Sequence, residues 1–133
     1  MAEKSGAAID YEAYGATTKP SNLKEVWPEG RKDDQGKDPW HLAPWDAFRA
    51  IVKVLQFGAG KYAPRNWENG MAWSRPYSAL IRHLTSWWEG EKADPETGYS
   101  HLWHAGCCIV FLIAFELRGI GTDDRPTKNL PAR

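Results

Sequence analysis

The chain is poor in cysteine, and its two cysteines stand next to each other as Cys107 and Cys108. Adjacent cysteines do not easily bridge to each other, and a buried thiol packs as a small apolar side chain. We therefore interpret both as reduced core residues, which is typical of a cytoplasmic protein rather than a secreted one. Residues 1–15 contain charged residues and no apolar segment, so we expect no secretory signal.

An excess of either charge is also absent, since 17 Lys and Arg residues balance 17 Asp and Glu residues. General nucleic-acid binders usually carry a strong basic excess, so we expect no general nucleic-acid binding. The longest apolar stretch, residues 106–115, is shorter than the roughly 18 residues that a membrane-spanning helix needs. The sequence therefore predicts that neither nucleic acid nor a membrane is a general partner.

No internal repeat and no strand-like alternation of apolar and polar residues is found. Apolar residues instead recur at helical spacing in three segments, at about 44–57, 74–89 and 101–118. Residues that favour helix ends flank these segments, namely Pro44, Gly58, Ser74, Gly90, Ser100 and Gly119. These patterns predict three helices and no sheet.

The predicted fold class is all-α, a small bundle of three main helices with an extended N-terminal arm. We expect a flexible leader at residues 1–23, a single helical domain at 24–120 and an irregular tail at 121–133. The length of 133 residues is enough for one core. Because three helices bury only a modest core, we expect a homo-oligomer that completes it.

Three of the four histidines lie close together in the sequence. His101 and His104 share one face at the start of the third helix, and an antiparallel hairpin would bring His83 near them. Carboxylates lie on and beside the connecting loop, namely Glu89, Glu91, Asp94 and Glu96. Such a mixed nitrogen and oxygen set suits a divalent transition metal better than magnesium alone. The alternative is a group of surface histidines bonded to carboxylates that complement the helix dipole.

Cations and aromatic residues flank the glycine-rich segment at residues 58–67. The cations are Lys61, Arg65, Arg75 and Arg82, and the aromatic residues are Tyr62 and Trp67. Converging cations can hold a triphosphate, and an aromatic ring can stack on a base. The segment is no P-loop, because its Gly-Lys pair lacks a following Ser or Thr. Solvated charges and aromatic residues that anchor the core or a loop are the alternative.

Seven short motifs follow one another in an order and spacing that are specific when they are taken together. They are Lys32-Asp-Asp-Gln-Gly-Lys37, Phe57-Gly-Ala-Gly-Lys-Tyr62, Arg65-Asn-Trp67, Arg82-His83, Trp87-Trp-Glu-Gly-Glu91, Asp94-Pro-Glu-Thr-Gly98 and His101-Leu-Trp-His104. Over residues 30–118, the chain resembles the N-terminal domain of the dATP/dGTP diphosphohydrolase family of phages and prophages. The resemblance implies hydrolysis of a purine deoxynucleoside triphosphate to the monophosphate and pyrophosphate, in the host cytoplasm if the chain is phage-encoded.

The resemblance also implies kinship with the all-α, MazG-like nucleotide pyrophosphatases. Those enzymes hold magnesium with Glu-x-x-Glu and Glu-x-x-Asp pairs. Here the pair on the third helix is His101-x-x-His104, and no carboxylate lies one turn before His83. The magnesium ligands are therefore not carried over residue by residue. We expect a divalent metal as cofactor, either Mg or a transition metal such as Mn.

The leading hypothesis is a metal-dependent hydrolase of dATP or dGTP. The predicted metal ligands are His83, Asp94, His101 and His104. The predicted catalytic carboxylates are Glu89, Glu91 and Glu96. The predicted substrate-binding residues are Lys61, Tyr62, Arg65, Trp67 and Arg82.

Two other hypotheses remain. The first is a phage nucleotide-binding protein that sequesters a nucleotide or a defence signal without turnover, with the histidines touching the ligand. The second is a structural or interaction module, which the eight tryptophans and the long arm favour.

Overall fold

The computed structural model describes residues 30–126, and the chain divides into two units between Pro39 and Trp40. In the first unit, residues 30–39 form no helix or strand, and their side chains are exposed. A turn is closed where the N–H of Lys37 donates to the carbonyl of Asp34 at 3.0 Å. The predicted leader, residues 1–23, lies outside the described residues.

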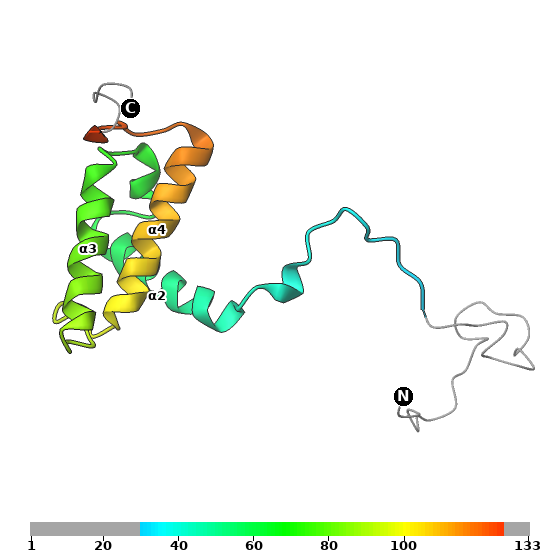
Figure 1. Cartoon of the computed structure of the whole chain (residues 1–133), viewed down its shortest axis with the longest axis horizontal. Helices are drawn as coiled ribbons and strands as arrows, with labels where there is room; N and C mark the ends of the chain where they lie inside the picture. The colour runs from blue at the N-terminus through cyan, green and yellow to red at the C-terminus, as the bar shows by residue number, and fades with distance from the viewer. Residues whose placement is uncertain (1–29, 127–133) are drawn as a thin grey trace, which may run out of the picture. The chain divides into compact units, whose positions relative to one another are not determined.

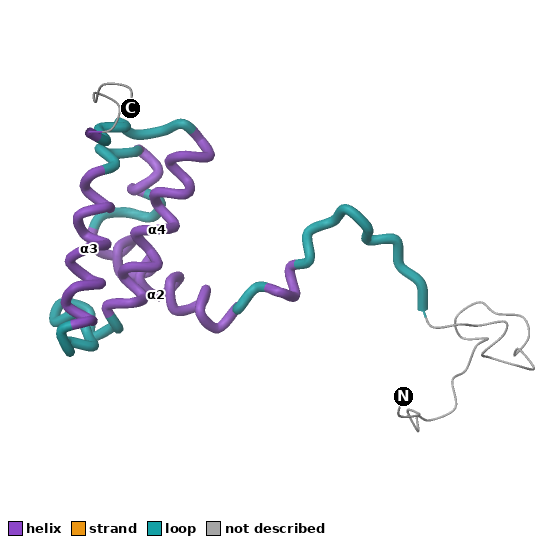
Figure 2. The backbone as a smooth tube through the Cα atoms, viewed as in Figure 1, coloured by secondary structure: helices purple, strands orange, loops and turns teal. Residues whose placement is uncertain are grey.

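The second unit is all-α over its described residues and contains no strand, which confirms the predicted fold class (Figure 2). Its α-helices are α2 (Trp45–Lys61), α3 (Ser74–Trp88) and α4 (His101–Arg118). Two 3-10 helices, η2 (Trp40–Leu42) and η3 (Asn66–Asn69), accompany them. Figure 1 shows α3 and α4 as an antiparallel hairpin, and α4 contacts both α3 and α2.

Helix α2 continues through Gly58 to Lys61, so the prediction that this glycine ends the helix was wrong. The N–H of Tyr62 still donates to the carbonyl of Gly58, at 2.9 Å. Glycine inside a helix costs roughly 1 kcal/mol relative to alanine, and tertiary packing can offset that cost. Here α2 packs tightly on α4, since a Cβ built on Gly106 would lie 2.9 Å from Cδ1 of Ile51.

Helix α4 begins and ends as predicted. The Oγ of Ser100 accepts a backbone N–H of the first turn, and Gly119 ends the helix with a φ of 63°. Helix α3 differs, because Ser74 is its first residue and not its N-cap. The carboxylate of Asp124 accepts the N–H of Ser74 at 2.9 Å instead. A cap from so far along the chain is not visible in local sequence patterns.

The segment after α4, residues 120–122, is hydrogen-bonded to the segment before α3, residues 71–73. The N–H of Trp73 donates to the carbonyl of Thr122 at 2.9 Å, and the N–H of Thr122 donates to the carbonyl of Met71 at 3.1 Å. The indole N–H of Trp73 donates to the carbonyl of Ile120 at 2.9 Å. At Gly121, a Cβ would lie 2.4 Å from the carbonyl oxygen of Met71. We call this contact the clasp, and it closes the open end of the hairpin.

Helix α4 is the most buried of the three helices. Its buried residues are His101, Ala105, Cys107, Cys108 and Phe115. Both cysteines are free and buried, which confirms the interpretation of them as reduced core residues.

By length and composition, the 18 residues of α4 are apolar enough to cross a membrane. The expectation that no membrane is a general partner stays a prediction, because this test considers only the length and composition of the helix. In this fold α4 is the helix that both α2 and α3 contact.

Candidate metal and nucleotide site

A cavity of about 1250 Å³ lies among α2, η3, α3, the loop before α4 and α4 itself. Its volume exceeds the range usual for small-molecule sites, roughly 300–1,000 Å³. Near the loop its wall is polar and includes His83, Asp94 and His104. Further along, Val54 and Phe111 make the wall apolar. A polar end beside an apolar wall suits a ligand with a charged group and a ring.

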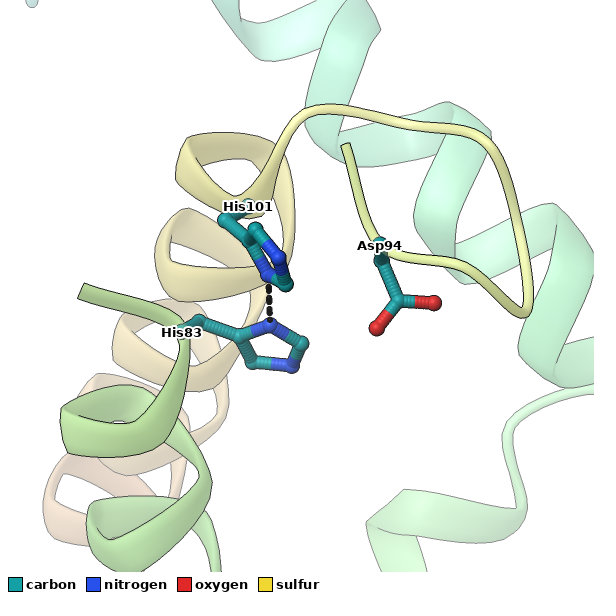
Figure 3. Close-up of side chains that lie close together, drawn as sticks. All are labelled: His83, Asp94 and His101. Atoms are coloured by element: carbon teal, nitrogen blue, oxygen red, sulfur yellow. Dashed lines mark hydrogen bonds between the residues drawn. The ribbon is translucent and has the colours of Figure 1, made fainter. Parts of the chain in front are cut away.

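The hairpin brings the three histidines together, as their spacing predicted. Nδ1 of His83 on α3 lies 2.8 Å from Nδ1 of His101 in the first turn of α4 (Figure 3). The ring of His104 stacks on the ring of His83, with centroids 4.6 Å apart and planes 11° from parallel. One turn of α4 and one residue of α3 therefore form a compact imidazole cluster.

Asp94 completes this cluster from the connecting loop. Figure 3 shows its carboxylate directed toward the space beside the rings of His83 and His101. One ligand atom from each of these three residues lies within 4.8 Å of the other two. Desolvation alone would raise the pKa of Asp94, but hydrogen bonds from the N–H groups of Thr97 and Glu96 outweigh it and lower that pKa. A carboxylate held in this way stays ionised beside the imidazoles.

The histidines are held in place by neighbours on the same loop. Nε2 of His101, whose ring is buried, lies 2.7 Å from Oε1 of Glu91. Nε2 of His104 lies 2.7 Å from Oγ1 of Thr97, and that hydroxyl accepts the N–H of Tyr99 at 3.2 Å. His104 thus lies beside the three-residue group and is anchored through its outer nitrogen. Carboxylates and hydroxyls that orient a histidine are a common feature of metal sites.

Burial sets the charge of the cavity-lining imidazoles. Desolvation is the main cause that lowers the pKa of His83, and the neighbouring His104 and His101 lower it further. Desolvation also lowers the pKa of His104. Both rings are therefore neutral near pH 7, which is the form that binds a metal.

The predicted cations differ in whether their side chains already have a carboxylate partner. Nζ of Lys61 lies 2.7 Å from Oε1 of Glu96, and this hydrogen bond raises the pKa of Lys61. Arg82 lines the cavity and forms no hydrogen bond or ion pair within the described part of the chain. Arg65 also lines the cavity, but its guanidinium is bound by both oxygens of Glu68. Of the three predicted substrate-binding cations, Arg82 is thus the best placed to meet an anion, and Arg75, which also lines the cavity, has no side-chain partner among the described residues either.

The two predicted aromatic residues also differ. Trp67 stacks on Phe111, with ring centroids 4.8 Å apart, and Arg118 lies over the same indole at 5.4 Å. Its faces are therefore occupied by the core and by an arginine. Tyr62 lines the cavity and is 68% exposed, with Lys61 over its ring at 5.4 Å. Tyr62 is the better placed of the two to stack on a base.

The three predicted catalytic carboxylates lie in three different settings. Glu89 is the exposed C-cap of α3 and does not line the cavity. Glu91 is engaged with His101, and Glu96 lines the cavity and pairs with Lys61. Sequence reasoning missed Thr97, although its position three residues after Asp94 is typical of a turn in which both side chains bond locally.

Comparison with known proteins finds a matching family and a similar phage protein, but no similar solved structure. A family described as dATP/dGTP diphosphohydrolase, N-terminal, matches residues 28–125. A protein of Salmonella phage PMBT28 named dATP/dGTP diphosphohydrolase is 32% identical over 96 residues, which are 72% of this chain and 33% of that protein. The chain therefore spans about a third of the length of that relative. No solved structure matches this chain.

Proposed function

Because the chain belongs to the dATP/dGTP diphosphohydrolase N-terminal family, we propose that it hydrolyses dATP or dGTP to the monophosphate and pyrophosphate with a divalent metal. The observation that carries this proposal is the convergence of His83, Asp94 and His101 to within 4.8 Å, with His83 and Asp94 in the cavity wall and His101 buried behind them. The name of the phage relative belongs to a longer protein, so the proposal for this chain depends on its own site.

The donor set fits a divalent transition metal. Two imidazole nitrogens and one carboxylate oxygen form the mixed group that Mn, Fe, Co, Ni or Zn prefer over the all-oxygen set of magnesium. Burial keeps the ring of His83 neutral, and Glu91 orients the ring of His101. A metal bound there would polarise a phosphoryl oxygen and lower the pKa of a bound water.

The residues around the cluster are suited to binding a triphosphate. Arg82 would neutralise part of its charge with a bidentate contact, and Lys61 would add a second positive charge by exchanging its ion pair with Glu96 for the triphosphate. Glu96 lines the cavity beside the cluster and is the carboxylate that would take a proton from the attacking water. Tyr62 would stack on the purine, and the open cavity leaves room for its two rings.

The first experiment is a product analysis. Metal-stripped protein is incubated with each of the four deoxynucleoside triphosphates, with and without Mg, Mn or Co. Ion-exchange chromatography then identifies the products. We expect metal-dependent release of monophosphate and pyrophosphate from dATP or dGTP. Intact nucleotide in every reaction would contradict hydrolysis.

A matched pair of variants tests the site itself. His83→Ala removes a member of the cluster, whereas His41→Ala removes the histidine of η2, which lies outside the cavity. We expect His83→Ala to lose metal binding in calorimetry and to lower kcat/KM by roughly 100-fold or more. His41→Ala should match the wild type in both measurements, and full activity in His83→Ala would exclude the cluster as the site.

One observation favours a second function, nucleotide binding without turnover. His83, His101 and Glu91 form a hydrogen-bonded chain, and Nε2 of His104 is bonded to Oγ1 of Thr97. Such a network could contact a sequestered nucleotide or defence signal directly. The product analysis distinguishes the two functions, because this one predicts stoichiometric, metal-independent binding and recovery of intact ligand.

A further inference from the structure

The side of α3 that faces away from the cavity carries a row of large apolar side chains. Tyr77, Ile81, Leu84 and Trp88 follow one another at intervals of 4, 3 and 4 residues, which is the spacing of a helix-packing seam. Their exposed fractions run from 39% to 82%. None of the four lines the cavity. A seam-like row is thus present without a partner helix among the described residues.

Helix α4 carries a second row on the same side. Leu102, Ile109, Ile113 and Leu117 are all more than 40% exposed. At about 100° per residue, Leu102, Ile109 and Ile113 lie about 120° to 160° around α4 from Cys107, which lines the cavity, and Leu117 lies about 80° from it, at the edge of the row. Since the cavity is on one side of the α3–α4 pair, the two rows share the other side. We call this surface the rear face.

The rear face is nearly uncharged. Helical periodicity places Glu116 there as the single charged residue contributed by the described parts of α3 and α4. A fully exposed large side chain has roughly 200 Å² of surface, so the exposed fractions of the eight residues amount to about 850 Å². A stable protein–protein interface buries about 800 Å² on each partner. The available area therefore matches what a dimer needs.

We propose that the rear face pairs with the rear face of a second copy of this chain in a two-fold dimer. A patch with one charged residue is nearly self-complementary, because two-fold symmetry brings its apolar rows against each other and Glu116 lies near the C-terminal end of α4, away from their centre. Pairing would also bury the exposed side of α4, a helix whose composition is apolar almost all round. The cavity lies on the other side of the hairpin and stays open in such a dimer. This inference does not rest on the proposed function.

The test is the mass of the full chain in solution. We expect sedimentation equilibrium at micromolar concentration to give twice the chain mass of 15.0 kDa. Ile81→Glu and Ile113→Glu, which place a charge at the centre of the rear face, should give the monomer mass with unchanged helical circular dichroism. Lys53→Glu, at an exposed position of α2 outside the rear face, is the matched control and should remain dimeric.

A milder variant covers the case in which a buried charge perturbs the fold. Trp88 is 82% exposed at the end of α3, so Trp88→Ala leaves the core of the monomer intact. We expect it to raise the dimer Kd roughly tenfold or more. If the wild-type chain has the monomer mass, the proposal is overturned. Binding of that monomer to phosphatidylcholine vesicles would then assign the rear face to a membrane surface instead. A dimer that persists in all three rear-face variants also overturns it, since another surface would then form the interface.

Discussion

At the scale of single residues, the site depends on groups whose charge is set by burial. Desolvation lowers the pKa values of His83 and His104, and backbone hydrogen bonds keep the pKa of Asp94 low despite its desolvation. A neutral imidazole beside an ionised carboxylate is the combination that a divalent cation requires. The same burial has consequences for stability that can be measured without any metal or nucleotide.

Stability should fall in acid because of these histidines. Their folded pKa values lie below the value of about 6.5 in an unfolded chain, so the unfolded state takes up protons first as the pH falls. Their contribution to the free energy of unfolding is fully present above about pH 6.5 and is lost as the pH falls toward their lowered folded values. Urea unfolding at pH 7.5 and 5.5 measures the loss. It should be smaller in His83→Gln, and an equal loss would contradict this origin.

The two cysteines should be inert in the folded protein. Burial raises the pKa of the Cys107 thiol to about 12 and also raises the pKa of Cys108. Because the thiolate is the reactive form, we expect iodoacetamide at pH 8 to leave both thiols unmodified in the native protein. In urea both should be alkylated, as read by mass spectrometry. Rapid alkylation of the native protein would show that α4 is less buried than described.

Sequence reasoning predicted the histidine cluster because its members are tied to a short hairpin. It was less informative for Arg65, which lines the cavity but is held by Glu68. The backbone of Arg65 is left-handed, with a φ of 62°, and Arg118 shares the carboxylate of Glu68 with it. Neither feature leaves a trace in local sequence spacing.

At the scale of the helices, local sequence signals predicted which elements form. Some helix ends differ from the prediction because tertiary contacts determine them. Ser100 and Gly119 bound α4 by interactions within a few residues, so their positions were predictable. Gly58 lies inside α2, which packs on α4 at Ile51, and the start of α3 is capped by Asp124. These two features depend on the fold as a whole and were not predictable from residue preferences.

Two glycines after α4 allow the clasp to be tested with an internal control. Both have positive φ, 63° at Gly119 and 77° at Gly121, but only at Gly121 would a Cβ meet backbone, 2.4 Å from the carbonyl oxygen of Met71. Gly119→Ala should therefore cost only the conformational strain, about 1 kcal/mol. Gly121→Ala should cost roughly 3 kcal/mol or more, because the clasp must open. Urea unfolding compares them, and equal costs would mean that the clasp contributes nothing.

At the scale of the whole molecule, the fold class and the family were predictable because both depend on long patterns. The helical periodicity covers the hairpin, and the family motifs span most of the domain. The expected homo-oligomer stays a prediction, since sequence periodicity alone does not say which apolar surface is covered by the core and which by a partner.

Metal binding should stabilise the whole fold, because the cluster joins α3, α4 and the loop between them. A ligand at 100 times its Kd adds about 2.7 kcal/mol to the free energy of unfolding. For a domain of this size we expect Tm to rise by about 10 °C with a bound transition metal. Differential scanning fluorimetry should show the rise in the wild type and in His41→Ala. A similar rise in His83→Ala would place the metal elsewhere.

The clasp also shapes how the hairpin loosens. Free helix ends normally open first and exchange their amide hydrogens independently of each other. Here the end of α4 and the start of α3 are joined through Trp73, Thr122 and Asp124. Neither end can open without releasing the other, so the two form one cooperative unit toward solvent. The hairpin thus has no loose end at its clasped side, and the exchange of those amides reports the opening of both helices together.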